Sequence, residues 1–480
     1  MNDILYPPGP RSRIPGQLLR RFRRDPISLL TEMAQVYGDI SQVKIGPSRL
    51  YLLNNPDYIK DVLVTDHRNF RKSLVLQRTR ILLGDGLLTS EGDLHLRQRR
   101  MIQPIFHRQR IANYADVMVA YANRTSKRWQ ALAGEDQALT LDISAEMMHL
   151  TLTIVAKTLF DEDVEEQTTE IGEAISIVMS LFSRLSSPIA SLLSRLPLPS
   201  NRRFEQAKAQ LDTTIQTMIA ERRLTGDRGD LLSLLLQAQD SDGDGSGMSD
   251  QQVKDEALTL FLAGHETTSN ALTWTWYLLS QNPSAEARLH AELDRVLAGR
   301  LPSASDFDRL EYTRMVFSEA MRMYPPAWVL GRQVIDHYPV DGYIIPSGST
   351  VLMSQWVMHH DARYYPEPYT FRPERWAPEA QAGRPKFAYF PFGGGPRLCI
   401  GEPFAWMEGV LLLATLAQQW RMRLVPGHPV ERLPLITLRP KFGMRMHLYR
   451  RQESFSNPQS MESIQPYAME KSGLVDRTAE

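Results

Sequence analysis

The sequence predicts a mainly α-helical protein with a small β-rich part. Residues 249–281 lack proline and predict one helix of about 32 residues, on the order of 45 Å long at about 1.5 Å per residue. Gln252 lies three residues after Ser249, a spacing typical of the capping box that starts a helix. Two stretches of alternating apolar residues, 40–45 and 49–53, flank a glycine-proline pair and predict a β-hairpin.

The other elements follow in order along the chain. Helices are predicted over residues 26–37, over most of 56–225 with breaks at Gly84-Asp85-Gly86, Gly134 and Pro197 to Pro199, over 283–298, over 312–324, and from Cys399 to Trp420. Strands are predicted at 331–335, 343–345 and 350–353, so that residues 40–55 and 326–380 form the β-rich part. We expect one domain over residues 1–452, because no linker divides it, and a disordered polar tail over 453–480.

The composition argues against several classes of protein. The 55 basic and 55 acidic residues balance, so no overall field would attract nucleic acid. No apolar run has transmembrane length and the first residues lack the pattern of a signal peptide, so we expect a cytoplasmic protein without a transmembrane anchor. One cysteine in 480 residues does not require an oxidising compartment. Arginine clusters at 20–24 and 97–110 are typical of solvated faces, or of docking sites for an acidic partner.

One acidic loop resembles part of a calcium-binding loop. Asp240, Asp242, Asp244 and Gly245 match the opening of an EF-hand. The twelfth position, which should supply a bidentate glutamate, is Gln251, and the chain has no second copy of the loop. Short acidic linkers rich in glycine share this pattern, so we expect no calcium site.

The only cysteine lies in the most distinctive segment of the chain, Phe392-Gly393-Gly394-Gly395-Pro396-Arg397-Leu398-Cys399-Ile400-Gly401. The three glycines let the backbone bend sharply and turn its N–H groups towards one point. Cys399 would begin a helix, whose positive end stabilises a thiolate. A thiolate held in this way can be a nucleophile or a metal ligand. Alternatively, the cysteine is an inert, buried structural residue.

This segment resembles the haem-ligand signature of the cytochrome P450 family, Phe-x-x-Gly-x-Arg-x-Cys-x-Gly. The fixed positions are filled by Phe392, Gly395, Arg397, Cys399 and Gly401. The resemblance implies that Cys399 is the axial ligand of the iron in haem b, where a thiolate pushes electron density onto the metal. It also implies that Phe392 shields the sulfur from water, that Gly401 lets the chain pass the porphyrin, and that Arg397 pairs with a haem propionate.

A second segment of this kind lies inside the long helix, at Ala263-Gly264-His265-Glu266-Thr267-Thr268. A threonine hydroxyl can take the carbonyl four residues back and bend a helix, and glycine permits a local opening. Alone, the hexapeptide would be a polar patch. Beside the cysteine signature it resembles the family's oxygen-activation segment, which implies that Ala263 borders the cofactor and that Glu266 and Thr267 manage protons. His265 would pack or face solvent and would not be a ligand.

Glu319 and Arg322, three apart on one helix face, resemble the family's Glu-x-x-Arg pair. That pair is completed by a further arginine, which we take to be Arg375. The resemblance implies a structural charge network that braces the loop presenting Cys399. The family often has phenylalanine after this arginine, and the departure to Trp376 should not matter.

Two more motifs suit the carboxylates of haem. His95 and Arg99, four apart on one helical face, resemble the family's His-x-x-x-Arg motif, and Arg332 matches a strand arginine. Together with Arg397, these residues would supply about two cationic groups per propionate, enough to bury both carboxylates without an unpaired charge.

The resemblance spans about residues 5–450 and implies a cytochrome P450 fold, with haem between the long helix and the helix starting at Cys399. The implied function is a monooxygenase that inserts one oxygen atom of O2 into a C–H or C=C bond. The expected lining of the substrate site is apolar and comprises residues 76–88, 177–196, 260–263 and 326–330, with Trp328 as its bulky aromatic in the last segment. A hydrophobic small molecule is the expected substrate, with a terpenoid as the first guess.

No flavin or iron–sulfur segment is present, so electrons would come from separate partners, a ferredoxin with its reductase or a flavodoxin. Two alternatives stay open. A peroxide-using haem-thiolate peroxygenase or rearrangement enzyme would not need the pair Glu266 and Thr267. A non-catalytic haem sensor would not need an apolar substrate site. The pair and the apolar segments favour the monooxygenase.

Overall fold

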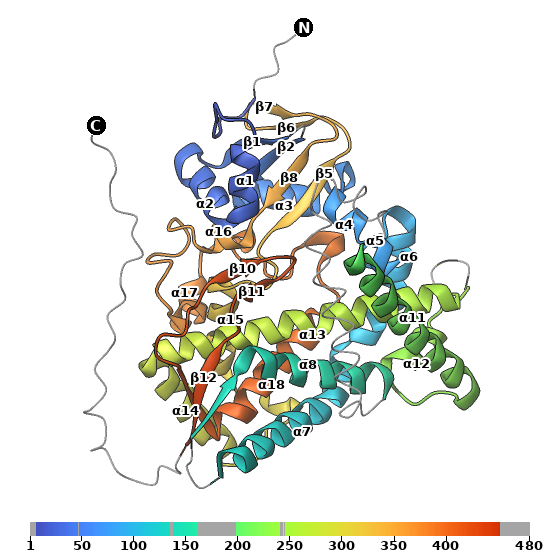
Figure 1. The fold of residues 1–480 in the computed structure, drawn as a ribbon, viewed down its shortest axis with the longest axis vertical. Coiled ribbons are helices and arrows are strands. Elements are labelled where there is room, and N and C mark those ends of the chain that lie inside the picture. The colour runs from blue at the N-terminus through green and yellow to red at the C-terminus, as the bar shows by residue number, and fades with distance from the viewer. Residues whose placement is uncertain are drawn as a thin grey trace.

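Figure 1 shows a computed structural model of the chain, which describes residues 6–46, 48–134, 138–161, 198–240, 243 and 245–451. Helices fill most of the molecule, and most of the strands gather at the end near the N-terminus. The predicted tail over 453–480 and the expected lining segment 177–196 lie outside the described residues.

The described α-helices are α1 (Gln17–Arg24), α2 (Pro26–Tyr37), α3 (Pro56–Lys60), α4 (Leu74–Arg78), α5 (Arg80–Leu83), α6 (Gly92–Ile102), α7 (Arg108–Ala133), α8 (Ile143–Phe160), α11 (Pro199–Thr225), α12 (Leu231–Gln237), α13 (Asp250–Gln281), α14 (Pro283–Leu297), α15 (Glu311–Met323), α16 (Gln355–His359), α17 (Pro378–Gln381) and α18 (Glu402–Ala417). The strands are β1 (Ile40–Ile45), β2 (Ser48–Leu53), β3 (Phe70–Lys72), β4 (Ala138–Asp142), β5 (Leu330–Val334), β6 (Tyr338–Val340), β7 (Tyr343–Ile345), β8 (Thr350–Met353), β9 (Trp420–Leu424), β10 (Arg432–Pro434), β11 (Leu438–Pro440) and β12 (Arg445–Arg450).

The long helix α13 crosses the middle of the molecule (Figure 1). Its N-terminus has the predicted capping box, because Ser249 and Gln252 each accept the other's backbone N–H with a side-chain oxygen. Most of its side chains are buried, since α8, α11, α15 and α18 pack around it. It is therefore the scaffold against which the other elements are positioned.

The largest sheet has five strands in the order β1-β2-β8-β5-β3. β1 and β2 form the predicted antiparallel hairpin, in which Ile45 lies opposite Ser48. β2 pairs in parallel with β8, which joins the beginning of the chain to residues 350–353. A second sheet, β4-β12-β9, and the hairpins β6-β7 and β10-β11 complete the β-rich part.

The prediction of a helix from Cys399 to Trp420 was wrong at both ends. α18 begins at Glu402, with Pro403 in its first turn, where a missing N–H costs no helical hydrogen bond. It ends at Ala417, and Trp420 begins β9. The side chain of Trp420 is buried, so the apolar pattern continues past the helix and does not mark where the helix ends. The helices predicted over 26–37, 283–298 and 312–324 are confirmed to within a residue or so as α2, α14 and α15.

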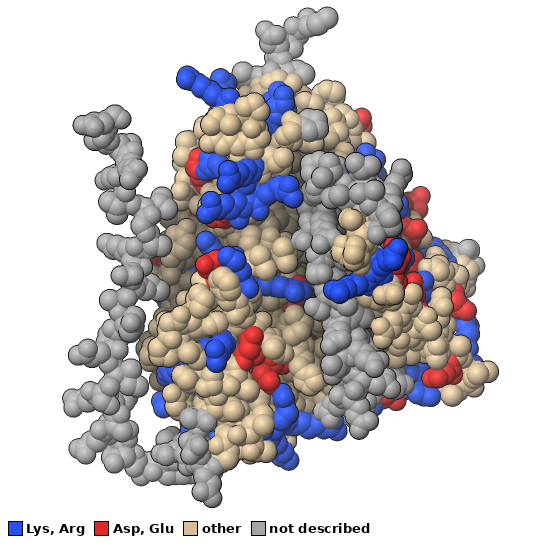
Figure 2. Space-filling model, viewed as in Figure 1, with Lys and Arg blue, Asp and Glu red and all other residues tan. Residues whose placement is uncertain are grey.

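The surface seen in Figure 2 carries basic and acidic side chains side by side, with a concentration of arginine over α1. Asp240 of the acidic loop is buried and forms ion pairs with Arg97 at 3.4 Å and Arg100 at 3.0 Å, which attach this loop to α6. Within the described ranges, every helix falls short of the length and apolarity that a bilayer-spanning segment needs.

Glu408 is an exception in the otherwise apolar middle of α18. The residue is fully buried, and burial raises the pKa of its carboxyl to about 8, while the Thr268 hydroxyl of α13 lowers that pKa in part. Neither carboxyl oxygen forms a well-aligned hydrogen bond with the described residues. The carboxyl is therefore protonated at neutral pH, which avoids a buried unpaired charge.

We expect Glu408→Gln to change how stability depends on pH. In the unfolded chain a glutamate ionises near pH 4.3, whereas the folded protein keeps this proton up to about pH 8. The folded state thus binds one proton more between these values, and its free energy of unfolding falls as the pH rises, by up to about 1.4 kcal/mol per pH unit. Glutamine removes this dependence. The stability of the variant relative to the wild type, measured by thermal unfolding, should therefore increase as the pH rises from about 5 to about 8.

The control is Glu311→Gln, at the exposed start of α15, which should follow the wild type at every pH. A difference between Glu408→Gln and the wild type that stays constant with pH would contradict a protonated Glu408.

Candidate active site

The loop that carries Cys399 is folded by its own backbone. The Cys399 N–H donates to the Phe392 carbonyl at 3.0 Å, and the Leu398 N–H donates to the Gly395 carbonyl at 3.0 Å. Gly395 has a φ of 66°, and a Cβ atom there would lie 1.8 Å from the Leu63 carbonyl oxygen, so only glycine fits. The loop therefore brings the sulfur to a defined point just before α18.

The Cys399 thiol is enclosed by protein atoms and is nevertheless accessible, which means that it borders an interior space. Burial raises the pKa of the thiol, while the Gly401 N–H and the Arg99 guanidinium lower it in part. A thiol in such surroundings becomes a thiolate when a metal cation coordinates it. The setting suits a metal ligand better than a freely ionised nucleophile.

The middle of α13 also borders an interior space. Ala263 is exposed and Thr267 is partly exposed, although Leu262, Glu266 and Thr268 beside them are buried. The Thr267 hydroxyl donates to the Ala263 carbonyl at 2.8 Å, as the sequence predicts. His265 is buried with its Nδ1 atom 2.9 Å from the Phe261 carbonyl oxygen, so it packs inside the protein. The structure describes one α-helix through this segment, from Asp250 to Gln281, and so does not show the expected local opening.

Glu266 is buried and held by the hairpin β10-β11. Its Oε1 atom accepts hydrogen bonds from Arg439 Nε at 2.6 Å and from the Thr437 hydroxyl. Its Oε2 atom makes no hydrogen bond with the described residues. The Arg439 side chain is 27% exposed, against 3% for that of Glu266, so the ion pair connects a buried carboxylate with solvent.

Five basic side chains from four segments share one buried region: Lys72, His95, Arg99, Arg332 and Arg397. Burial, together with repulsion from Arg397, lowers the pKa of Lys72 to about 6 and that of His95 to about 3. The pKa of Arg332 falls to about 10 for the same two reasons. These mutual effects show that the groups lie close together.

Acceptors within the protein only partly satisfy this cation cluster. Glu91 forms an ion pair with Arg397. Arg99 donates to the Leu398 carbonyl at 2.7 Å, next to the cysteine. Among the described residues, the buried Arg332 guanidinium donates only to the Gly331 carbonyl, at 3.0 Å. Because a buried charge is costly without a counter-charge, the cluster calls for an additional anion.

The predicted charge network around Glu319 is assembled in full. Arg322 donates to both carboxylate oxygens at 2.9 Å, and Arg375 donates to Oε1 at 3.2 Å. The Trp376 indole N–H donates to Oε2 at 2.9 Å. The expectation that Trp376 is immaterial was therefore wrong, because phenylalanine at this position would leave the buried carboxylate one donor short.

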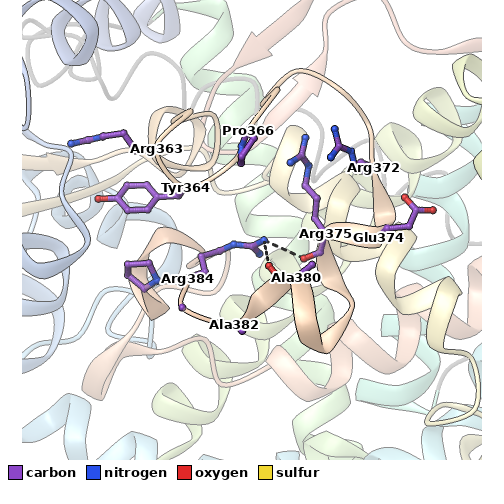
Figure 3. Close-up of a pocket in the computed structure, with 11 residues that line it drawn as sticks. Arg363, Tyr364, Pro366, Arg372, Glu374, Arg375, Ala380, Ala382 and Arg384 are labelled. Carbon is purple, nitrogen blue, oxygen red and sulfur yellow. Dashed lines mark hydrogen bonds between the residues drawn. The ribbon is translucent and has the colours of Figure 1, made fainter.

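A hollow of about 550 Å³ lies beside this network (Figure 3). Its arginines already have partners: Arg363 pairs with Asp39 at 2.7 Å, and Arg384 donates to the Arg375 and Ala380 carbonyls at 3.2 Å. Figure 3 shows several charged side chains in the lining, mostly arginines, whereas a hydrophobic substrate needs a predominantly apolar pocket. The hollow is a solvated feature of the surface.

The expected position of Trp328 in the substrate lining was wrong. The side chain is 5% exposed and packs in a core cluster with Ile27 and Leu30 of α2. Its indole N–H donates to the Leu435 carbonyl at 2.8 Å. Trp328 therefore anchors the turn between β10 and β11, a role that required a partner 107 residues away.

The model of the cytochrome P450 family matches residues 7–444. The chain is a cytochrome P450. It is 42% identical over 418 residues to cyclooctatin synthase of Streptomyces melanosporofaciens, covering 86% of this chain and 89% of that one. It is 33% identical over 435 residues to pentalenene oxygenase of Streptomyces avermitilis, covering 90% and 94%.

Solved structures agree with this assignment. The cytochrome P450DA heme domain superposes with a TM-score of 0.84 at 25% identity, covering 94% of this chain and 98% of that one. Retinoic acid-bound cyanobacterial CYP120A1 gives a TM-score of 0.82 at 25% identity, covering 94% and 100%. This P450 is thus a haem-thiolate monooxygenase that uses O2 and redox partners to oxidise a hydrophobic molecule.

The residues present fit a haem. A haem brings an iron ion for one thiolate and two carboxylates for nearby cations. Here an accessible cysteine sulfur lies near a cluster of basic side chains in which Arg397 pairs with Glu91 and Arg332 lacks such a carboxylate among the described residues. Arg99 of this cluster contacts the chain at Leu398, next to the cysteine. Both unmet requirements of the protein interior, a ligand for the thiol and counter-charges for the cations, would be met by that one group.

Sequence reasoning missed several polar residues at this site. Lys72 donates to the Leu87 and Ser90 carbonyls at 2.9 and 2.8 Å, and nothing local distinguishes it from a surface lysine. Asp255 and Glu256 accept the backbone N–H groups of residues 85 and 87, each at 2.9 Å, and so hold this glycine-rich turn on α13. Asp255 and Glu256 are adjacent acidic residues on a helix predicted to be largely buried, and this feature could have indicated that they bind polar groups inside the protein.

We expect Trp376→Phe to lower the free energy of unfolding by about 1.5–3 kcal/mol, the usual range for a hydrogen bond to a charged group. The ring is kept and one donor to Glu319 is lost. Chemical denaturation measures the effect. The matched control is Trp328→Phe, which removes an indole N–H bonded to a neutral carbonyl and should cost less, about 0.5–1.5 kcal/mol. Equal costs for the two variants would contradict a special role for Trp376.

Proposed function

We propose that this P450 binds haem b through Cys399 and oxidises an apolar terpenoid, within one catalytic domain over residues 1–452. The observation that carries the proposal is the accessible Cys399 thiol in the same region as the buried Arg332 guanidinium, which has no carboxylate in an ion pair with it among the described residues. The names of two relatives, pentalenene oxygenase and cyclooctat-9-en-7-ol 5-monooxygenase, specify terpenoid substrates and support that substrate class.

In this proposal each residue has a defined task. When bound, the haem supplies the oxygen chemistry, since a thiolate ligand donates electron density to the iron and favours O–O cleavage. Cys399 is the thiolate, and the Gly401 N–H stabilises its charge. Phe392 shields the sulfur, and Gly401 leaves room for the porphyrin.

The cation cluster of Lys72, His95, Arg99, Arg332 and Arg397 would hold the propionates. Their carboxylates would replace the missing counter-charges and raise the lowered pKa values of Lys72 and Arg332 again. The network of Glu319, Arg322 and Arg375 would act at a distance by bracing the segment that leads to the cysteine loop.

Protons would pass through Glu266 and Thr267. The Glu266 carboxylate faces solvent only through Arg439, so release from this ion pair would let it pick up a proton and carry it inward. The Thr267 hydroxyl, now bonded to the Ala263 carbonyl, would turn to donate into the interior space. Ala263 leaves that space open because its side chain is small. Electrons would come from a ferredoxin with its reductase or from a flavodoxin, which would dock near the cysteine loop.

Carbon monoxide binding to the dithionite-reduced protein tests the cofactor assignment. We expect a strongly red-shifted Soret band for the wild type, because a thiolate ligand would donate electron density to the haem iron. Cys399→Ser should lose this band, even if it retains haem. A wild-type spectrum without the red shift, or an unchanged spectrum for Cys399→Ser, would overturn the assignment of Cys399 as the ligand.

We expect Thr267→Ala to lower the product formed per NADPH by roughly tenfold or more, because a proton donor is lost, while haem content stays normal. The assay uses a substrate identified by its spin-state shift. Thr275→Ala is a matched control, since this hydroxyl makes the same kind of bond, to the Ala271 carbonyl at 2.7 Å, in a buried position. Normal coupling in Thr267→Ala would show that the proton assignment is wrong.

A further inference from the structure

An unpaired basic face lies at the beginning of the chain, on and before α1. It consists of Arg11, Arg13, Arg20, Arg23 and Arg24, and we call it the N-terminal basic face. All five side chains are exposed, and none has an ion pair or hydrogen bond within the described part of the chain. Figure 2 shows the concentration of basic side chains over α1. Arg21, in the same helix, is instead paired with Glu32.

The helix that presents this face is anchored on the protein. Leu18 and Phe22, four apart, pack against the core cluster that includes Ile27 and Leu30. Arg20 and Arg24, also four apart, point away from that contact and are exposed. The apolar side of α1 is therefore already used, and its basic side is a fixed platform that faces solvent.

The charge is local to this part of the chain. Basic and acidic residues balance over the whole sequence at 55 each, but residues 6–25 contain six arginines and one aspartate. Exposed apolar side chains lie among the cations, with Ile14 64% exposed and Tyr6 39% exposed. Cations with interspersed exposed apolar groups are typical of surfaces that bind the headgroup region of anionic bilayers.

We propose that the N-terminal basic face binds the anionic surface of a lipid bilayer, so that the enzyme works as a peripheral protein. The arginines would contact lipid phosphates, and Ile14 would enter the boundary between headgroups and acyl chains. Membrane binding would bring the enzyme to its substrate, because an apolar substrate partitions into bilayers and would be concentrated there. This advantage rests on the proposed function. Exposed Ile14 favours lipid over an acidic protein surface, because the acyl boundary of a bilayer receives an apolar side chain whereas acidic side chains would pair only with the arginines.

The test is flotation of the purified, haem-loaded full chain with vesicles. Vesicles of phosphatidylcholine with about one third phosphatidylglycerol should bind the protein, whereas pure phosphatidylcholine should bind it weakly. Binding should be lost at about 1 M salt, where exposed charges are screened within roughly 3 Å. The double variant Arg20→Glu with Arg24→Glu should bind at least roughly tenfold more weakly, since each arginine contributes about fivefold.

The matched control reverses two charges elsewhere. Arg421 and Arg450 are exposed on the paired strands β9 and β12 and lack ion pairs with described residues. Figure 1 shows β12 at the opposite end of the molecule from α1. Arg421→Glu with Arg450→Glu should bind vesicles as the wild type does. Ile14→Asn, which removes apolar surface without changing the charge, should weaken binding at unchanged salt dependence.

Three results would overturn the proposal: no binding of the wild type to anionic vesicles, equal losses in both double variants, or unchanged vesicle binding of Arg20→Glu with Arg24→Glu. In the last case, slower reduction of that variant by a ferredoxin would assign the face to an electron donor. The assay needs neither turnover nor a known substrate, so its failure is separate from a failure of the proposed monooxygenase reaction.

Discussion

Buried positive charge that the protein does not neutralise is the constraint on which the rest of the structure depends. Arg99, Arg332 and Arg397 come from separate segments and meet beside Glu91, which is the ion-pair partner of Arg397. Repulsion among these guanidinium groups costs folding free energy, which a bound anion would offset. The same region contains an accessible cysteine. A dianionic metal cofactor would supply both the counter-charges and a metal for the thiol.

The network around Glu319 is the opposite case. There one buried carboxylate receives donors from Arg322, Arg375 and Trp376, and no group is missing. Both charge clusters contain motif residues of the family and both are buried. The protein itself supplies the hydrogen-bond and charge partners of the Glu319 network but only part of those that the cation cluster requires. That difference separates a structural network from a binding site, and it is visible only when the partners of each polar atom are known.

α13 combines two tasks that require different residues. Its length and burial make it the scaffold of the fold, while Ala263 and Thr267 face an interior space at its middle. Glu266 lies in the same part of the helix as Ala263 and Thr267 but is buried. The β10-β11 hairpin supplies Arg439 and Thr437 as its hydrogen-bond partners. The acidic residue is thereby buried without being isolated from solvent, which a helix alone could not achieve.

The sequence by itself determined the elements with local signals. The capping box of α13, the β1-β2 hairpin and the glycine-dependent cysteine loop each depend on residues within a few positions of one another. The motif residues also identified the family and most of the proposed site. The boundaries of α18, the core position of Trp328 and the donor role of Trp376 were decided by tertiary structure.

The polar residues that hold the proposed site together were also decided by the tertiary structure. Lys72 and Arg439 have no local feature that marks them, and their roles arise only when the fold buries one and positions the other beside Glu266. The physical reason is that backbone conformation responds to near neighbours, whereas burial and hydrogen bonding depend on segments that are distant in sequence and meet only in the folded protein.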